Sequence, residues 1–123
     1  GNILQTSGQL PMADGGLAVT GTLGDNVSLE KGQEAARHCA LNILAQAKAA
    51  LGGDLTRIRR LLKRTVFVAS APSFTDQHKV ANGASDLLVE LLGDIGKHSR
   101  SAVGVPALPM GAAVEIEAVF EIA

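Results

Sequence analysis

The sequence is poor in aromatic side chains: its 123 residues include three Phe and neither Trp nor Tyr. Its core must therefore be built from Leu, Ile and Val together with many small Ala side chains, which let neighbouring elements pack closely. Apolar residues make up 46% and charged residues 19%, a balance that excludes an intrinsically disordered chain. No apolar run approaches the roughly 20 residues that cross a bilayer. We expect residues 1–123 to form one soluble domain with no membrane partner.

Cysteine is also scarce. Cys39 is the only one, so no internal disulfide can form, which fits the reducing cytoplasm where we place the protein. The neighbouring His38 does not make a catalytic dyad, because successive helical side chains point about 100° apart. A buried, small apolar role is the favoured interpretation of Cys39. His38, His78 and His98 lack the spacing of metal ligands, so we predict no metal and no cofactor.

Net charge is close to zero, at −1, and supplies no long-range attraction to polyanions. One local basic run stands out, formed by Arg57, Arg59, Arg60, Lys63 and Arg64. It could bind phosphates, or it could be the solvated start of a strand whose charges discourage edge aggregation. Base-stacking aromatics and a histidine pair for acid–base cleavage are both missing. Nucleic acid is therefore not an expected partner.

The first half of the chain predicts a hairpin followed by a helix. Residues 3–7 and 17–20 have short strand patterns on either side of the turn signal Asp14-Gly15-Gly16. Ser28 can cap a helix that continues to about Leu51, where Gly52-Gly53 ends it. Its core-facing residues, at three- or four-residue spacing, are Ala36, Ala40, Ile43, Ala47 and Leu51.

The second half predicts strand, helix, strand, strand. Residues 61–69 form a β-branched run suited to a central strand. Ser73 and Asp76 form a capping pattern before a helix that ends near Gly93. The predicted inner face of that helix consists of Val80, Ala84, Leu87, Leu88 and Leu91. Residues 101–105 and 113–122 form two further strands, separated by a connection that contains Pro106, Pro109 and Gly111. The predicted order is β-β-α-β-α-β-β, an α+β fold with both helices on one sheet face.

Four segments carry a family resemblance: Ser7-Gly8-Gln9-Leu10-Pro11, Thr65-Val66-Phe67-Val68, Arg100-Ser101-Ala102-Val103 and Val114-Glu115-Ile116-Glu117-Ala118. They resemble the Rid (YjgF-like) family, in particular the subgroup known as putative endoribonucleases of the liver perchloric-acid-soluble protein type. The resemblance covers nearly the whole chain. It implies a chorismate-mutase-like fold and a homotrimer with ligand pockets in the clefts between subunits. The family's ligand-stacking aromatic would precede residue 1, so we expect a short N-terminal leader to be missing from this sequence.

The resemblance also implies roles for two charged residues on adjoining predicted strands. Arg100 would bind the substrate carboxylate through the paired hydrogen bonds that a guanidinium can form; the alternative is an ion pair between strands or between subunits. Glu115 would be the catalytic acid/base, positioning water against an imine carbon and then protonating ammonia. The alternative for Glu115 is an ordinary solvent-facing glutamate, because Glu117 and Glu121 share its face of the strand.

The remaining candidates follow the same resemblance. Ser7 and Gly8 would form a pocket wall, or only a turn that ends a strand, and Asn82 would line the pocket from the second helix. Ala102 occupies a substrate-binding position where the family often has Cys, Ser or Thr, and it cannot donate a hydrogen bond.

These residues favour an enamine/imine deaminase that converts small amino-acid-derived intermediates to a keto acid and ammonia. The alternatives are a non-catalytic trimer that binds a small carboxylate ligand, and an endoribonuclease.

Overall fold

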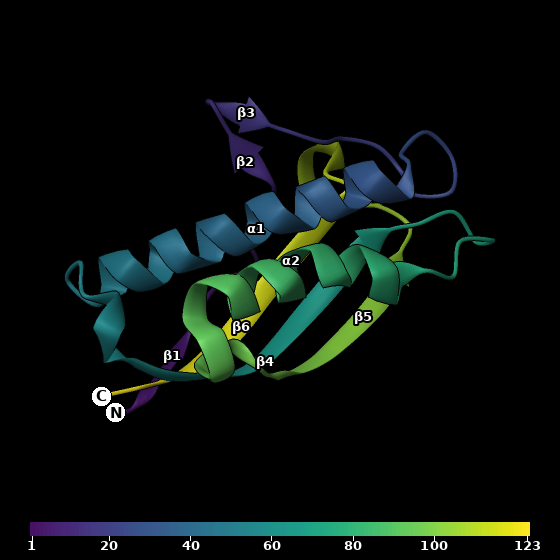
Figure 1. The fold of residues 1–123 in the computed structure, drawn as a ribbon. Helices are drawn as coiled ribbons and strands as arrows, with labels where there is room; N and C mark the ends of the chain where they lie inside the picture. The colour runs from purple at the N-terminus through teal and green to yellow at the C-terminus, as the bar shows by residue number, and fades with distance from the viewer.

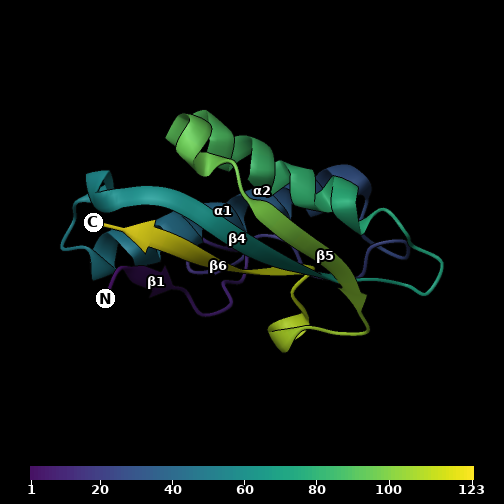
Figure 2. The ribbon, with the colours of Figure 1, turned by 90° about the horizontal axis from the view of Figure 1, so that it is seen from below.

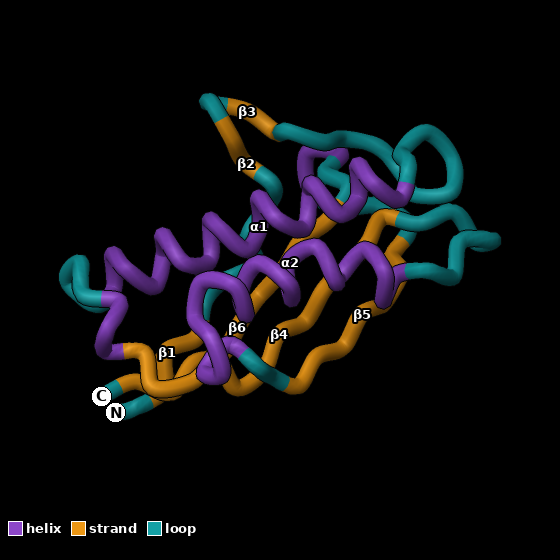
Figure 3. Tube along the Cα trace, viewed as in Figure 1, coloured by secondary structure: helices purple, strands orange, loops and turns teal.

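The structure, a computed structural model that describes residues 1–123, is built of a four-stranded sheet, a two-stranded sheet and two α-helices (Figure 1). In chain order the elements are β1 (Ile3–Gln5), β2 (Met12–Ala13), β3 (Gly16–Leu17), α1 (Leu29–Ala50), β4 (Ile58–Ala69), α2 (Gln77–Leu92), β5 (Ser99–Val105) and β6 (Val114–Ile122). Figure 3 shows that both helices lie on the same side of the long strands. The predicted α+β architecture is confirmed.

The main sheet has the strand order β1-β6-β4-β5. As predicted from its β-branched run, β4 is central: it pairs antiparallel with β6 and parallel with β5 (Figure 2). On β6 the alternation also follows the prediction, since Val114, Ile116, Ala118 and Phe120 are buried under the helices. The expected adjoining strands β5 and β6 are not neighbours in the sheet, because β4 lies between them.

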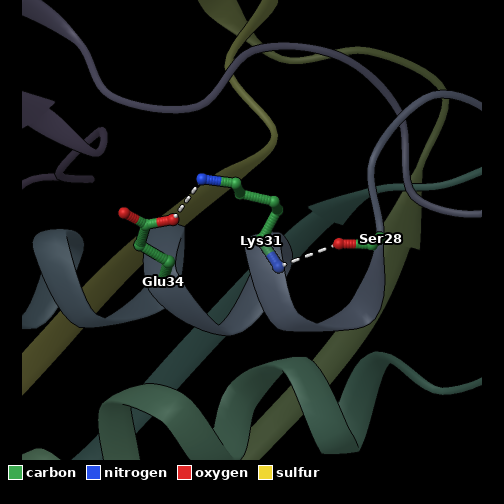
Figure 4. A network of polar contacts seen from close by, with 3 residues as sticks. All are labelled: Ser28, Lys31 and Glu34. Carbon is green, nitrogen blue, oxygen red and sulfur yellow. Dashed lines mark hydrogen bonds and ion pairs between the residues drawn. The ribbon is translucent and has the colours of Figure 1, made fainter.

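Helix α1 follows its sequence signals closely. The Ser28 Oγ accepts a hydrogen bond of 3.2 Å from the backbone N–H of Lys31, and the Lys31 ammonium lies 3.0 Å from the Glu34 carboxylate (Figure 4). The Ser28 bond satisfies one free donor of the first turn, which also carries the acidic side chain of Glu30. All five residues of the predicted inner face are buried.

Helix α2 departs from the prediction at its start and at one residue of its inner face. It begins at Gln77, and Asp76 precedes it without a side-chain capping bond, so Ser73 is not the cap. Gly93 ends the helix as expected. Leu91 is 54% exposed, which contradicts its assignment to the inner face. The Gly96 segment returns against the backbone carbonyl of the buried Leu88 and leaves Leu91 uncovered.

The predicted N-terminal hairpin is wrong in its pairing. The turn at Asp14-Gly15 exists, with positive φ at both residues, but it joins the short strands β2 and β3. Strand β1 pairs instead with β6, with Leu4 opposite Phe120. A short strand gains a full ladder along the free edge of β6, which a local hairpin of the same length could not provide.

Small residues set the separation of the two helices. A Cβ on Gly83 of α2 would collide with the backbone carbonyl of Gln33 on α1, and a Cβ on Gly32 would lie 2.9 Å from the Leu23 side chain. The core thus depends on close backbone approach rather than on large side chains, as the scarcity of aromatics predicts.

We predict that Gly83→Ala lowers the free energy of unfolding by about 1–3 kcal/mol, because the added methyl must push two helix backbones apart. Urea denaturation followed by circular dichroism measures the change. Gly16→Ala is the matched control, since nothing lies within 4 Å of a Cβ at Gly16. Equal stability of the two variants would contradict this account of the helix contact.

Candidate functional site

Arg100 lies on β5 with its side chain on the helix side of the sheet. Its two terminal nitrogens donate hydrogen bonds to Ser85 Oγ (2.9 Å) and to the carbonyl oxygen of His78 (3.2 Å), both on α2. It has no carboxylate partner, because the ion pairs of the chain are Lys31–Glu34, Lys79–Asp76 and Lys97–Asp94. The alternative of a structural ion pair within the chain is therefore not what the structure shows.

A second arginine lies directly beside it. Arg64 on β4 is paired in register with Arg100 and is fully buried, at 0% exposure. It donates to Ala81 O (3.0 Å), to Ser85 Oγ and to His98 Nε2 (3.2 Å), while its Nη1 has no partner. Burial, and next the positive charge of Arg100, lower the pKa of Arg64 to about 10. Arg64 therefore remains a cation at neutral pH.

His98 accepts the hydrogen bond from the Nε of the Arg64 guanidinium. Its Nδ1 lies 2.7 Å from the carbonyl oxygen of Gly96, and its Nε2 accepts from Arg64. These contacts fit a neutral ring with the proton on Nδ1. Burial lowers the pKa of His98 and the charges of Arg64 and Arg100 lower it further, against an opposing hydrogen bond to Gly96.

Glu115 lies on β6 beside the segment that follows β1. Thr6 and Gln9 attach this segment to β6 through backbone bonds with Ala118 and Ile116. Gly8 then lies under the Glu115 side chain, where a Cβ would collide with the carboxylate. The structure thus brings Glu115 together with Gly8 and the adjacent exposed Ser7, and Glu115 has no ion-pair partner.

Arg100 and Glu115 lie on opposite faces of the sheet. Arg100 is opposite Arg64, whereas Glu115 is opposite Phe67. Positions 64 and 67 of β4 differ by an odd number, so their side chains point to opposite faces about 10 Å apart along the strand. One chain therefore cannot close both residues around a single small molecule.

Two further candidates lie on the Arg100 side. Asn82 follows His78 by one turn of α2 and precedes Ser85 by three residues, so it shares the helix side that Arg100 contacts. Ala102 is two residues after Arg100 on the same face and packs against the core. It leaves no side-chain donor at that position.

A cavity of about 770 Å³ lies elsewhere, where β4 and β5 end; Ser70, Gln77 and Gly104 are among its lining residues. None of the predicted site residues lines it. Its one charged residue is Asp25, which would repel a carboxylate ligand. The cavity therefore offers no cationic side chain to a carboxylate, in contrast to the region around Arg100.

The other singled-out residues have simpler environments. Cys39 is buried, its thiol contacts Val114 O at 3.6 Å, and burial raises its pKa. The basic run does not form one surface, because Arg64 is buried while Arg59, Arg60 and Lys63 are exposed. No three His, Cys, Asp or Glu side chains gather where they could hold a metal ion. No helix is long and apolar enough to cross a membrane.

Sequence reasoning missed the roles of Arg64, Ser85 and His98. Arg64 lies within the basic run of the sequence, yet it shares the two-residue alternation of Val66 and Val68 and so belongs to their buried face. That alternation was a usable signal. Ser85 and His98 carried none, since their contacts depend on how α2 lies over β4.

We predict that His98 makes stability fall as the pH drops. Its pKa in the folded protein is below the usual 6.5, so the unfolded chain binds the proton more readily. The contribution is complete above about pH 6.5 and is lost as the pH falls towards the lower folded value. Urea unfolding between pH 7.5 and 5 should show a smaller loss in His98→Gln than in the unchanged protein. Identical pH profiles would contradict this assignment.

Comparison with known proteins shows the family of the chain. The family described as "YjgF/chorismate mutase-like, putative endoribonuclease" matches residues 1–121. Protein TCP17 of Trypanosoma cruzi is 53% identical over 97% of this chain and 74% of its own length. RutC family protein y4sK of Sinorhizobium fredii is 32% identical over 99% and 81%. The crystal structure of Atu1372, a protein of unknown function from Agrobacterium tumefaciens, has a TM-score of 0.99 at 55% identity over 100% of this chain and 77% of that one. The chain belongs to the YjgF/chorismate mutase-like family.

Proposed function

We propose that the protein is an enamine/imine deaminase whose site forms between two copies of the chain. The observation that carries this proposal is Arg100: a half-buried guanidinium, fixed by Ser85 and the His78 carbonyl, with no carboxylate of its own. A guanidinium held in this way can bind the carboxylate of a small substrate. The fold is able to hold such molecules, since the Escherichia coli protein TdcF, at 23% identity and a TM-score of 0.69, was crystallised with bound serine.

Glu115 supplies the proton chemistry in this proposal. Water attacks the carbon of the protonated imine, and its proton passes to the Glu115 carboxylate as the C–O bond forms. The protonated acid returns this proton to the nitrogen, and the carboxylate then accepts the hydroxyl proton of the adduct as the C–N bond breaks. The products are a 2-keto acid and ammonia. An enamine substrate first tautomerises to the imine, so the same two residues serve both substrates.

Because Arg100 and Glu115 lie on opposite faces of the sheet, a site that contains both residues requires a second chain. The sheet face that carries Glu115 has no helix over it and leaves Val103 45% exposed. The edge of β5 is likewise unpaired within the chain. Exposed sheet faces and edges are commonly covered by association. We propose a homotrimer in which Arg100 of one subunit faces Glu115 of the next.

We expect Arg100→Ala and Glu115→Gln each to lower kcat/KM at least 100-fold on freshly generated 2-iminopropanoate. Arg100→Ala should mainly raise KM, whereas Glu115→Gln should mainly lower kcat. Ammonia release measures both. Glu117→Gln is the matched control, since Glu117 occupies the same face of β6 two residues on. If the unchanged protein is no faster than buffer, the non-catalytic binding function, which Ala102 favours, replaces this proposal.

Mixing the two inactive variants tests the shared site directly. If each site takes Arg100 and Glu115 from neighbouring subunits, every mixed trimer should contain one intact site, so the mixed trimers should regain about a third of the activity of the unchanged protein. Co-expression with two affinity tags, followed by ammonia assays of the doubly tagged fraction, measures this. Absence of recovery in verified mixed trimers would place both residues in one subunit's site and contradict the proposed geometry.

Gly8→Ala should displace the Glu115 carboxylate while leaving the fold intact, because the added methyl meets only the flexible end of that side chain. A displacement of about 1 Å can lower turnover by about 10- to 100-fold. We expect kcat to fall with little change in melting temperature. Full activity of the Gly8→Ala protein would argue against Glu115 as the proton-transfer group.

A further inference from the structure

Arg64 carries a buried charge that nothing in the chain neutralises. It is among the largest fully buried side chains, and its Nη1 has no hydrogen-bond partner. The partners of its other nitrogens are a carbonyl, a hydroxyl and an imidazole nitrogen, which are all neutral groups. Buried charges in proteins are normally paired, because an unpaired ion in the interior is costly.

The second guanidinium makes the imbalance larger. Arg64 and Arg100 are register partners on parallel neighbouring strands and point to the same face. Both donate to the single hydroxyl oxygen of Ser85. Ser85 thus uses both of its acceptor positions on two like-charged groups, which holds the guanidiniums close despite their repulsion.

The surrounding ionisable groups do not compensate this charge. His98, which contacts Arg64, has a lowered pKa and fits the neutral form. Asp86 is near enough to influence Arg64, yet it is exposed and makes no ion pair with either arginine. Cys39 is a neutral thiol because burial raises its pKa. The positive charges of Arg64 and Arg100 are therefore not neutralised by any group of the chain around them.

We propose that Arg64 and Arg100 form a paired-guanidinium site that selects a small dianion, with Arg100 in contact with the ligand and Arg64 as the fixed charge behind it. Arg64 is closed off from solvent, so it is a positioning residue. It orients Arg100 through Ser85 and adds a second positive charge to the site. The ligand approaches from the His78 side, where the bond from Arg100 to α2 is exposed.

This inference shares Arg100 with the proposed deaminase but requires no turnover. If it holds, the preferred substrates carry a second acidic group besides the carboxylate next to the imine. Electrostatic attraction scales with ligand charge. Loss of the Arg64 charge should therefore reduce the affinity for a dianion by the square of the factor by which it reduces the affinity for a monoanion.

The test measures binding of malonate, propanoate and sulfate by calorimetry at pH 8 and constant ionic strength. We expect the unchanged protein to bind malonate more tightly than propanoate. Arg64→Met should lower the affinity for malonate about tenfold and the affinity for propanoate only about threefold. Arg59→Met is the matched control, since Arg59 is an exposed arginine on the same strand, and it should change neither. Sulfate that binds as well as malonate would assign the site to dianions in general, whereas weaker sulfate would assign it to dicarboxylates.

Arg64→Lys keeps the charge without the three-way hydrogen bonding, so it should retain most of the preference for malonate over propanoate. If Arg64→Met does not fold, two other measurements test the inference. They are the binding of both ligands by Arg64→Lys, and the melting temperature of the unchanged protein in malonate compared with that in propanoate. Equal binding of malonate and propanoate by the unchanged protein would overturn the inference. An equal loss of affinity for malonate and for propanoate in Arg64→Met would also overturn it. A deaminase that is active without dianion preference would overturn this inference alone.

Discussion

The two-residue alternation of β4 is the constraint on which the rest of the structure depends. As the central strand, β4 sets the register of β5 on one side and β6 on the other. From Lys63 to Val68, where the pairing with β6 has no register shift, each side chain is thereby assigned either to the helix-covered face or to the open one. This assignment puts Arg100 under α2 and Glu115 on the open side. The need for a second chain in the proposed site is thus a consequence of strand geometry, and it would persist with any rotamer of either residue.

Close helix packing gives the second constraint. Few large side chains are available, so α1 and α2 approach each other through Gly83 and a series of buried alanines. Their separation leaves α2 directly over β4 and β5, where Ser85 meets both arginines. The composition that first suggested a core of small residues therefore also determines the geometry of the Arg100 site. A larger residue at Gly83 would move α2 and, with it, the hydroxyl that holds the guanidiniums.

The sequence predicted most of the fold and only part of the candidate site. Periodicity located α1, the central strand and the alternating last strand, because each has a strong local pattern. It failed for β1, whose partner is more than a hundred residues away, and for the start of α2, where Ser73 matches a capping motif that the chain does not use. Arg100 and Glu115 were recognisable from their motifs. Their separation was not, since it follows from β4 inserting between their strands.

The charge of Arg64 is difficult to explain as a contribution to stability. An apolar side chain of similar volume at that position would cost no desolvation and would leave no donor unpaired, and such replacements of buried charges are often neutral or stabilising. The neighbouring positions Val66 and Val68 show what an ordinary residue of this face looks like. Ser85 and His98 nevertheless hold the guanidinium in place. A costly cation that is held this firmly, directly behind a ligand-accessible arginine, is better understood as part of a binding site than as part of the core.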